Sequence, residues 1–168
     1  MNRRACASVA GSFGMGLLLL AVGCADLKPR TSAVPAQPTW QGRLAVSVAG
    51  EPPQAFSASF VLAGSASQGV LTLTSVLGTS LATLRWNADG AVLKTPQNTQ
   101  SFASADAMVA YSVGTPLPMA TLFGWLQGDA TPVAGWQVDL QSRAQGRIKA
   151  WRLAPDAAAE IKIILDPG

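Results

Sequence analysis

The sequence VLTLTSVLGTSLATLRW, residues 70–86, predicts a pair of β-strands. Its first part, residues 70–74, and its last part, residues 80–86, consist mostly of aliphatic and β-branched side chains. In the first part Leu71 and Leu73 alternate with threonines, which is typical of a strand with one buried face. A short loop connects the two parts, so the stretch predicts two neighbouring antiparallel strands.

The loop between these strands has an unusual composition. Hairpin tips normally carry polar turn formers such as Asn-Gly or Asp-Gly, whereas this one carries Val76 and Leu77 before Gly78. Two interpretations remain open on the pattern alone. Either the apolar pair is tucked under a neighbouring loop, or Leu77 is displayed so that it contacts lipid or an apolar partner.

Further strands flank this hairpin on both sides. An alternation with period two begins at Trp40 and, after a turn at residues 50–53, continues to Leu62. The sequence Asn-Ala-Asp-Gly at residues 87–90 predicts a turn, and short strands joined by turns are typical of an antiparallel meander. The later segments predicted as strands are residues 91–94, 99–102, 136–141, 146–153 and 160–166.

Two short helices interrupt the strands. Ser104 caps a helix predicted over residues 105–112, and Gly114 ends that helix. Pro118 suits the first turn of a second helix, which Gly128 ends. The second helix carries a single apolar stripe at spacings of three and four residues, formed by Met119, Leu122, Phe123 and Leu126.

The pattern therefore predicts a mainly β (α+β) domain, in which one antiparallel sheet carries two helices across its apolar face like a lid. The helical stripe is either ordinary core, or it covers a gap that holds an apolar ligand. In the second case, the residues expected to line the gap are Phe56, Phe60, Leu71, Leu73, Leu84, Trp86, Leu122, Phe123 and Leu126, with Trp125 as a further aromatic candidate.

The composition excludes several classes of function. Hydrophobic residues make up 49% of the 168 residues and charged residues 12%, which is apolar for a soluble domain. Of the 12 basic residues, Arg3 and Arg4 lie at the extreme N-terminus, and without them the balance is 10 against 9 acidic residues. The sequence contains no basic patch interleaved with aromatic residues, so it does not indicate binding to nucleic acid. Because the chain has no histidine and no catalytic or metal-binding motif, we expect neither an enzyme nor a cofactor.

The N-terminus predicts an exported lipoprotein. Residues 1–23 contain two arginines followed by a short apolar run, as in a signal peptide, and Cys24 follows directly. The sequence before Cys24 resembles the bacterial lipobox, in which the cysteine becomes the acylated first residue; the alternative is a plain thiol. Residues 24–39 are rich in Pro, Ala, Ser and Thr, which predicts a flexible tether leading to a domain at residues 40–168.

Four segments carry a resemblance to a known family. In order they are WQGRLAVSV, LTLTSVLGTSLATLRW, GTPLPMATLFGWLQGD and AQGRIKAWRLAP, and the resemblance that they carry covers about residues 40–166. Their order and approximate spacing resemble the LolB family of outer-membrane lipoprotein receptors. The resemblance implies a curved, unclosed antiparallel sheet, or half-barrel, with short helices as a lid over a hydrophobic cavity.

The resemblance also implies an activity and partners. Members of this family accept acylated lipoproteins from the periplasmic carrier LolA and insert them into the outer membrane. A leucine on a protruding loop is needed for the insertion, and by position that role falls on Leu77, in the loop with Val76 and Gly78. We therefore expect a monomer held by lipid at the periplasmic face of the outer membrane. The alternative is a structural or assembly lipoprotein of the envelope that transfers nothing.

Overall fold

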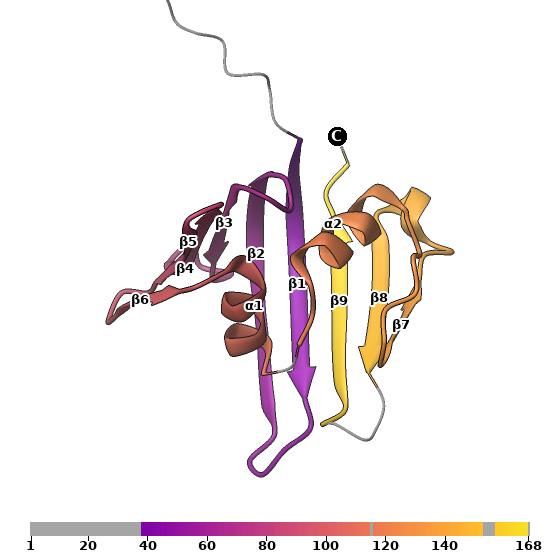
Figure 1. Ribbon diagram of the computed structural model, residues 1–168. Helices are drawn as coiled ribbons and strands as arrows, with labels where there is room; N and C mark the ends of the chain where they lie inside the picture. Colours follow the sequence, from indigo (N-terminus) through magenta and orange to yellow (C-terminus); the bar gives the residue numbers. More distant parts are fainter. Residues whose placement is uncertain (1–37, 115, 153–156, 168) are drawn as a thin grey trace, which may run out of the picture. The chain divides into compact units, whose positions relative to one another are not determined.

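The computed structural model describes residues 38–114, 116–152 and 157–167. These residues form one antiparallel sheet in the order β6-β5-β4-β3-β2-β1-β9-β8-β7, whose two edge strands do not pair with each other. The sheet curves around two short helices (Figure 1), so the predicted fold class is confirmed. The strands are β1 (Thr39–Val48), β2 (Gln54–Gly64), β3 (Gly69–Thr74), β4 (Ser80–Asn87), β5 (Gly90–Lys94), β6 (Thr99–Phe102), β7 (Trp136–Asp139), β8 (Arg147–Arg152) and β9 (Ala159–Leu165).

The strand register separates an apolar face from a polar one. Leu71 of β3 lies opposite Leu62 of β2 and Leu84 of β4, so large side chains meet across neighbouring strands on the inner face. On the outer face Thr72 lies opposite Thr83. Side chains alternate along each strand, so the apolar residues of the sequence gather on the inner face of the sheet. This apolar face must be covered by other elements.

The two helices cover that inner face. Helix α1 (Ala105–Val113) begins at Ser104, whose hydroxyl accepts a hydrogen bond from a backbone N–H of the first turn, and ends at Gly114 in the left-handed conformation. Helix α2 (Met119–Gln127) follows Pro118, which occupies the N-cap position and not the first turn itself.

Side chains from elsewhere in the domain satisfy both ends of α2. At its start, the backbone N–H of Met119 donates to Oδ1 of Asp106 in α1 at 2.7 Å. At its end, the guanidinium of Arg143 donates to the carbonyl of Leu126, with Nε at 2.9 Å. These bonds satisfy backbone groups that a helix leaves unpaired. Arg143 lies in a short 3-10 helix, η1 (Arg143–Gln145), that the sequence patterns did not predict.

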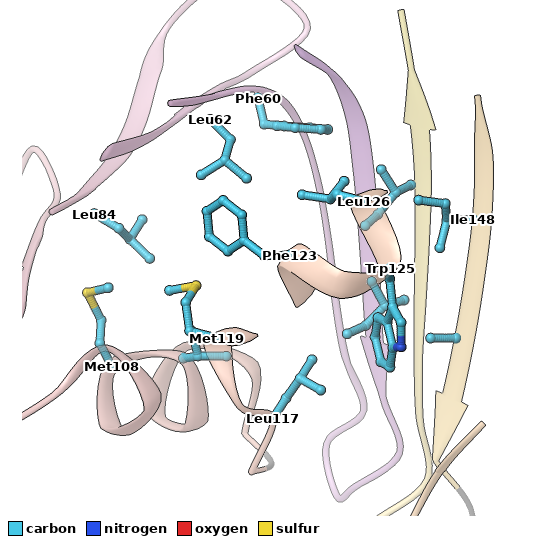
Figure 2. Packing of buried hydrophobic residues seen from close by; sticks show 14 of the residues in the cluster. Phe60, Leu62, Leu84, Met108, Leu117, Met119, Phe123, Trp125, Leu126 and Ile148 are labelled. Atoms are coloured by element: carbon cyan, nitrogen blue, oxygen red, sulfur yellow. The ribbon is translucent and has the colours of Figure 1, made fainter. Parts of the chain in front are cut away.

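Aromatic side chains dominate the centre of the core. Phe123 points from α2 towards Leu62 of β2 (Figure 2). Its ring makes edge contacts with Trp40, at 5.4 Å between centroids, and with Trp86, at 6.2 Å. A Cβ added at Gly69 would lie 2.5 Å from the ring of Trp86, so only glycine leaves room for this tryptophan. Burying each such side chain contributes roughly 1.5–3 kcal/mol.

The signal peptide predicted at residues 1–23, the acylation predicted at Cys24 and the predicted tether as far as residue 37 lie outside the described residues. The sheet and core of the described part of the chain come from residues 39–165, so we expect the chain from Val34 onward to fold without the preceding residues. Among the described residues, no helix has the length and apolar character that crossing a bilayer requires.

Candidate functional site

A cavity of about 810 Å³ lies between the sheet and the two helices. Its walls come from β1, β2, β3, β4, β5 and β9 and from both helices with their connection. None of the residues that line it carries a charge. They are Leu44, Val46, Val48, Pro53, Gln54, Ala55, Phe56, Leu71, Leu73, Leu81, Ala82, Leu84, Leu93, Thr95, Val109, Tyr111, Ser112, Val113, Leu117, Leu122, Ile161 and Ile163.

The chemistry of this lining suits an apolar ligand. A charged group in the cavity would lose its hydration without gaining a partner of opposite charge, which costs several kcal/mol. Hydrocarbon loses nothing of that kind, and the volume lies within the range of about 300–1,000 Å³ typical of ligand pockets. The cavity therefore favours an aliphatic chain over a polar or charged small molecule.

The structure brings five of the nine predicted lining residues to the cavity. These are Phe56, Leu71, Leu73, Leu84 and Leu122. The other four do not line it, because they pack into the closed core beside it. They are Phe60, Trp86, Phe123 and Leu126.

Trp86 and Trp125 do not line the cavity, because other contacts hold their rings in the core. Trp86 donates from its indole Nε1 to the carbonyl of Ser65 at 3.0 Å, which ties the ring to a loop. Trp125 is fully buried and its ring stacks at a tilt against Trp136, with 5.9 Å between centroids. The indole rings therefore pack in the core, whereas the cavity lining is mostly aliphatic.

Sequence reasoning missed two strands of the cavity wall. Leu44, Val46 and Val48 of β1 line the cavity together with Ile161 and Ile163 of β9. The signal that could have found them is present, because both segments alternate with period two. What was missing is the pairing of β1 with β9, which places Leu44 opposite Ile163.

The loop between β3 and β4 displays its apolar side chains. Val76 is 87% exposed and Leu77 is 90% exposed, which excludes the interpretation that the pair is tucked under a neighbour. The hydroxyl of Ser75 accepts the backbone N–H groups of Leu77, at 3.3 Å, and Thr79, at 3.1 Å. Gly78 adopts a φ of +81°, which favours glycine. The loop backbone is thus fixed by hydrogen bonds, while Leu77 projects into solvent.

This loop extends directly from the cavity wall. Leu73 of β3 and Leu81 of β4 both line the cavity, and they lie just before and just after the loop. The register between the two strands shifts at Leu73 and Thr74, so that Leu81 has no direct partner on β3. The displayed leucine and the apolar cavity are therefore parts of one region of the sheet.

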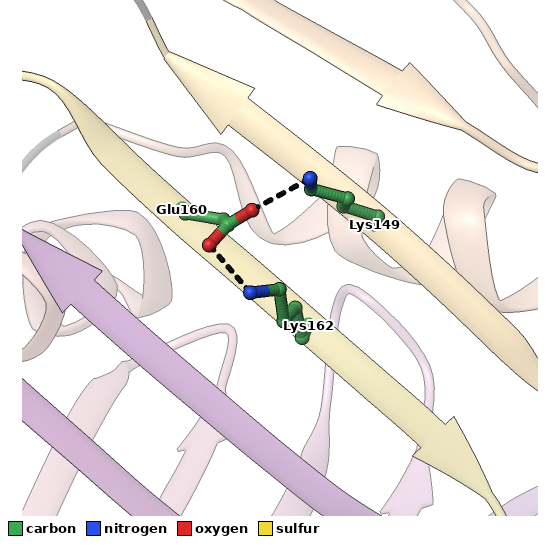
Figure 3. A network of polar contacts seen from close by, with 3 residues as sticks. All are labelled: Lys149, Glu160 and Lys162. Carbon is green, nitrogen blue, oxygen red and sulfur yellow. Dashed lines mark ion pairs between the residues drawn. The ribbon is translucent and has the colours of Figure 1, made fainter.

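The outer face of the sheet carries an ion-pair network. The carboxylate of Glu160 contacts Nζ of Lys162 at 2.7 Å and Nζ of Lys149 at 2.9 Å (Figure 3). Hydrogen bonds from Lys162 and then from Lys149 hold the pKa of Glu160 below its usual value. These groups lie largely in solvent, and the described residues contain no cluster of three or more side chains suited to a metal ion. The network is therefore a surface feature of modest energy.

A second depression, of about 690 Å³, lies near the start of β1 and the end of β9. Its lining mixes Trp40 and Leu165 with the polar groups of Gln41, Arg143 and Asp166. Such a lining would leave charged groups against hydrocarbon. The cavity under the helices is thus the better candidate for an apolar ligand.

Comparison with known proteins identifies a family for this chain. Residues 37–158 match the protein family described as outer membrane lipoprotein LolB. A curated protein from Shewanella baltica, named outer-membrane lipoprotein LolB, is 29% identical over 139 residues, which cover 77% of this chain. The same alignment covers 64% of the relative, so the chain spans less than two thirds of that protein's length. The family match includes strands β1–β8, both helices and the loop with Leu77.

Proposed function

The chain belongs to the LolB family of outer-membrane lipoproteins, and from that premise we propose that it is a receptor for other lipoproteins. It accepts acylated lipoproteins from the periplasmic carrier LolA and inserts them into the outer membrane. It acts as a monomer. It needs no cofactor, because binding and release of a lipid group break no covalent bond.

The observation that carries this proposal is the uncharged cavity of about 810 Å³ beneath the two helices. An acyl chain in water gains about 0.8 kcal/mol for every methylene group that it buries. A cavity lined by leucine, valine and isoleucine offers that gain, whereas the outer face, with its lysines and glutamate, does not. For delivery the cavity must bind an acyl chain less tightly than the bilayer does, and transfer to the membrane then needs no nucleotide.

Leu77 supports the second half of the proposal, which is delivery. A single leucine side chain gains roughly 1.5–3 kcal/mol when it enters an apolar phase, which is enough for brief docking on a bilayer but not for permanent attachment. Permanent attachment falls to the acyl chains on Cys24, since more than one chain gives stable anchoring. The two apolar elements thus divide the work, with Cys24 holding the protein at the periplasmic face and Leu77 contacting the membrane during release.

The test is a two-step transfer assay with purified components. LolA loaded with a fluorescent acylated lipoprotein is mixed with the domain that begins at Val34, and liposomes are added afterwards. We expect the cargo to move to the domain and then to the liposomes. In the variant Ala82→Trp an indole fills part of the cavity from β4, so uptake should fall while the fold persists.

Two results would contradict the proposal. A domain that takes no cargo from the carrier favours a structural or assembly lipoprotein of the envelope. Equal uptake by the parent and by Ala82→Trp means that the cavity is not where the acyl chains bind.

A further inference from the structure

Two aromatic side chains mark the opening of the cavity. Phe56, near the start of β2, is 41% exposed, and Tyr111, in the last turn of α1, is 60% exposed. Both also line the cavity. A side chain that borders a cavity and also reaches solvent lies at its mouth, so these two residues flank the opening from the sheet side and from the helix side. The ring of Phe102, at 5.2 Å from that of Tyr111, supports the tyrosine from behind.

The loop with Leu77 lies along the same end of the sheet as Phe56. In the pairing of β2 with β3, Ser59 lies opposite Thr74, the last residue of β3. The earlier part of β2, which contains Phe56, therefore runs on beside the loop that follows Thr74. Together Phe56, Tyr111, Val76 and Leu77 form what we call the mouth surface.

The segments around the opening carry almost no charge. The described residues of these segments are 49–57, 74–81, 95–98, 110–114 and 116–117, and among them Glu51 is the single charged residue. The outer face differs, since strands β8 and β9 alone present Arg147, Lys149, Glu160 and Lys162. Interfaces between proteins commonly use complementary charges to steer the partners together. The four side chains of the mouth surface are themselves uncharged aromatic and aliphatic groups, and Phe56 also borders a depression that Glu160 and Lys162 line.

We propose that the mouth surface rests on the lipid bilayer, so that the cavity opens directly onto the membrane. Tyrosine suits this role because its ring is apolar and its hydroxyl remains hydrated at the level of the headgroups. The uncharged rim can enter this region without losing the hydration of ionic groups. The inference rests on the proposed function, and it adds that Phe56 and Tyr111 contact lipid together with the loop. An acyl chain then passes from cavity to bilayer without crossing water.

The experiment uses site-specific labels and lipid alone. Both cysteines of the chain, Cys6 and Cys24, precede Val34, so the domain from Val34 onward accepts a single introduced cysteine. An environment-sensitive dye is attached in the variants Phe56→Cys and Tyr111→Cys. Val61→Cys is the matched control for the first, because Val61 lies on the opposite face of the same strand and is 48% exposed. Ile164→Cys on the outer face of β9 is the control for the second.

The vesicles consist of phosphatidylethanolamine and phosphatidylglycerol, with a quencher in the acyl region. We expect dye emission at positions 56 and 111 to shift to shorter wavelength and to be quenched, while positions 61 and 164 do not respond. In an independent variant, Phe56→Ser combined with Tyr111→Ser, vesicle binding should fall about tenfold, which corresponds to the loss of roughly one buried side chain. Val61→Ser should bind as the parent does, and circular dichroism should show each variant folded.

Several outcomes overturn the inference. An unchanged dye emission at positions 56 and 111, or an equal change in emission at all four labelled positions, would mean that the mouth surface does not rest on lipid. A response at 56 and 111 to the carrier protein but not to vesicles would make it a protein-docking surface. Because neither cargo nor carrier is present in the vesicle experiment, a domain that binds vesicles through positions 56 and 111 but takes no cargo would refute only the receptor function.

Discussion

Replacing Leu77 by aspartate should block delivery and leave the fold intact. The side chain is 90% exposed, so only about a tenth of the roughly 1.5–3 kcal/mol available from a leucine is realised in the folded protein. The expected loss of stability is therefore at most about 0.3 kcal/mol. The hydrogen bonds that fix the loop come from the backbone and from Ser75, and the substitution removes none of them.

The effect on the membrane step is far larger. On an insertion scale leucine contributes about −0.5 kcal/mol and aspartate about +3 kcal/mol within the apolar region of a bilayer. The substitution therefore opposes entry of the loop by about 3.5 kcal/mol, which corresponds to roughly 300-fold in the population of the membrane-docked state. Uptake of cargo should be unchanged, since Leu77 does not line the cavity.

The assay compares thermal unfolding, uptake from LolA and release into liposomes for the parent and for Leu77→Asp. Ala88→Asp is the matched control, because it introduces the same charge in an exposed turn at the other end of β4. It should release cargo as the parent does. Normal release by Leu77→Asp would refute the role given to this residue. A drop in melting temperature of many degrees would refute the description of the loop as free of packing.

Three other substitutions test the anchor, the core and the outer face. Cys24→Ala in the full chain should yield a protein that lacks acylation and fractionates away from the outer membrane. The control Cys6→Ala should fractionate normally. Recovery of Cys24→Ala as an acylated outer-membrane protein would refute the prediction that Cys24 is the acylated residue. Phe123→Ala should lower the free energy of unfolding by about 3–5 kcal/mol in urea titration, because the ring is buried, and a loss under 1 kcal/mol would contradict that packing. Glu160→Gln should cost less than about 1 kcal/mol at pH 7, since the ion pairs are exposed. Because Lys162 and a second lysine lower the pKa of Glu160, the contribution of the carboxylate to the free energy of unfolding is present above the usual pKa of 4.5 and disappears as the pH falls below it. A stability difference between Glu160→Gln and the parent that grows with falling pH would contradict this pH dependence.

Local patterns were enough to predict most of the fold. The alternation around Leu71 and Leu73 depends only on neighbouring residues, and it placed strands and faces correctly. The ends of α1 could also be predicted, because Ser104 and Gly114 each make a hydrogen bond with a backbone group within one turn of the helix. The turn η1 was not predicted, because its arginine caps a helix some seventeen residues earlier, a contact that no local pattern encodes.

The cavity could be predicted only in part. A sequence indicates which side chains face inward, but whether they fill a space depends on the curvature of the sheet and on the height at which the helices lie. Phe123 and Leu122 are adjacent on one stripe, yet the first is buried against tryptophans and the second borders the cavity. The exposure of Leu77 likewise depends on how the other described elements pack around the hairpin, which the sequence of a single hairpin does not reveal.

The pairing of β1 with β9 also determines the order in which the chain can fold. Strands β1 to β6 form a continuous series of hairpins, so they can assemble as soon as each has emerged. The partner on the other side of β1 is more than a hundred residues away in sequence, and closing so long a loop is slow. Until β9 pairs with it, β1 presents an unpaired edge beside most of the apolar cavity wall, a combination that favours aggregation. We therefore expect the newly made chain to need protection until its last strand has docked.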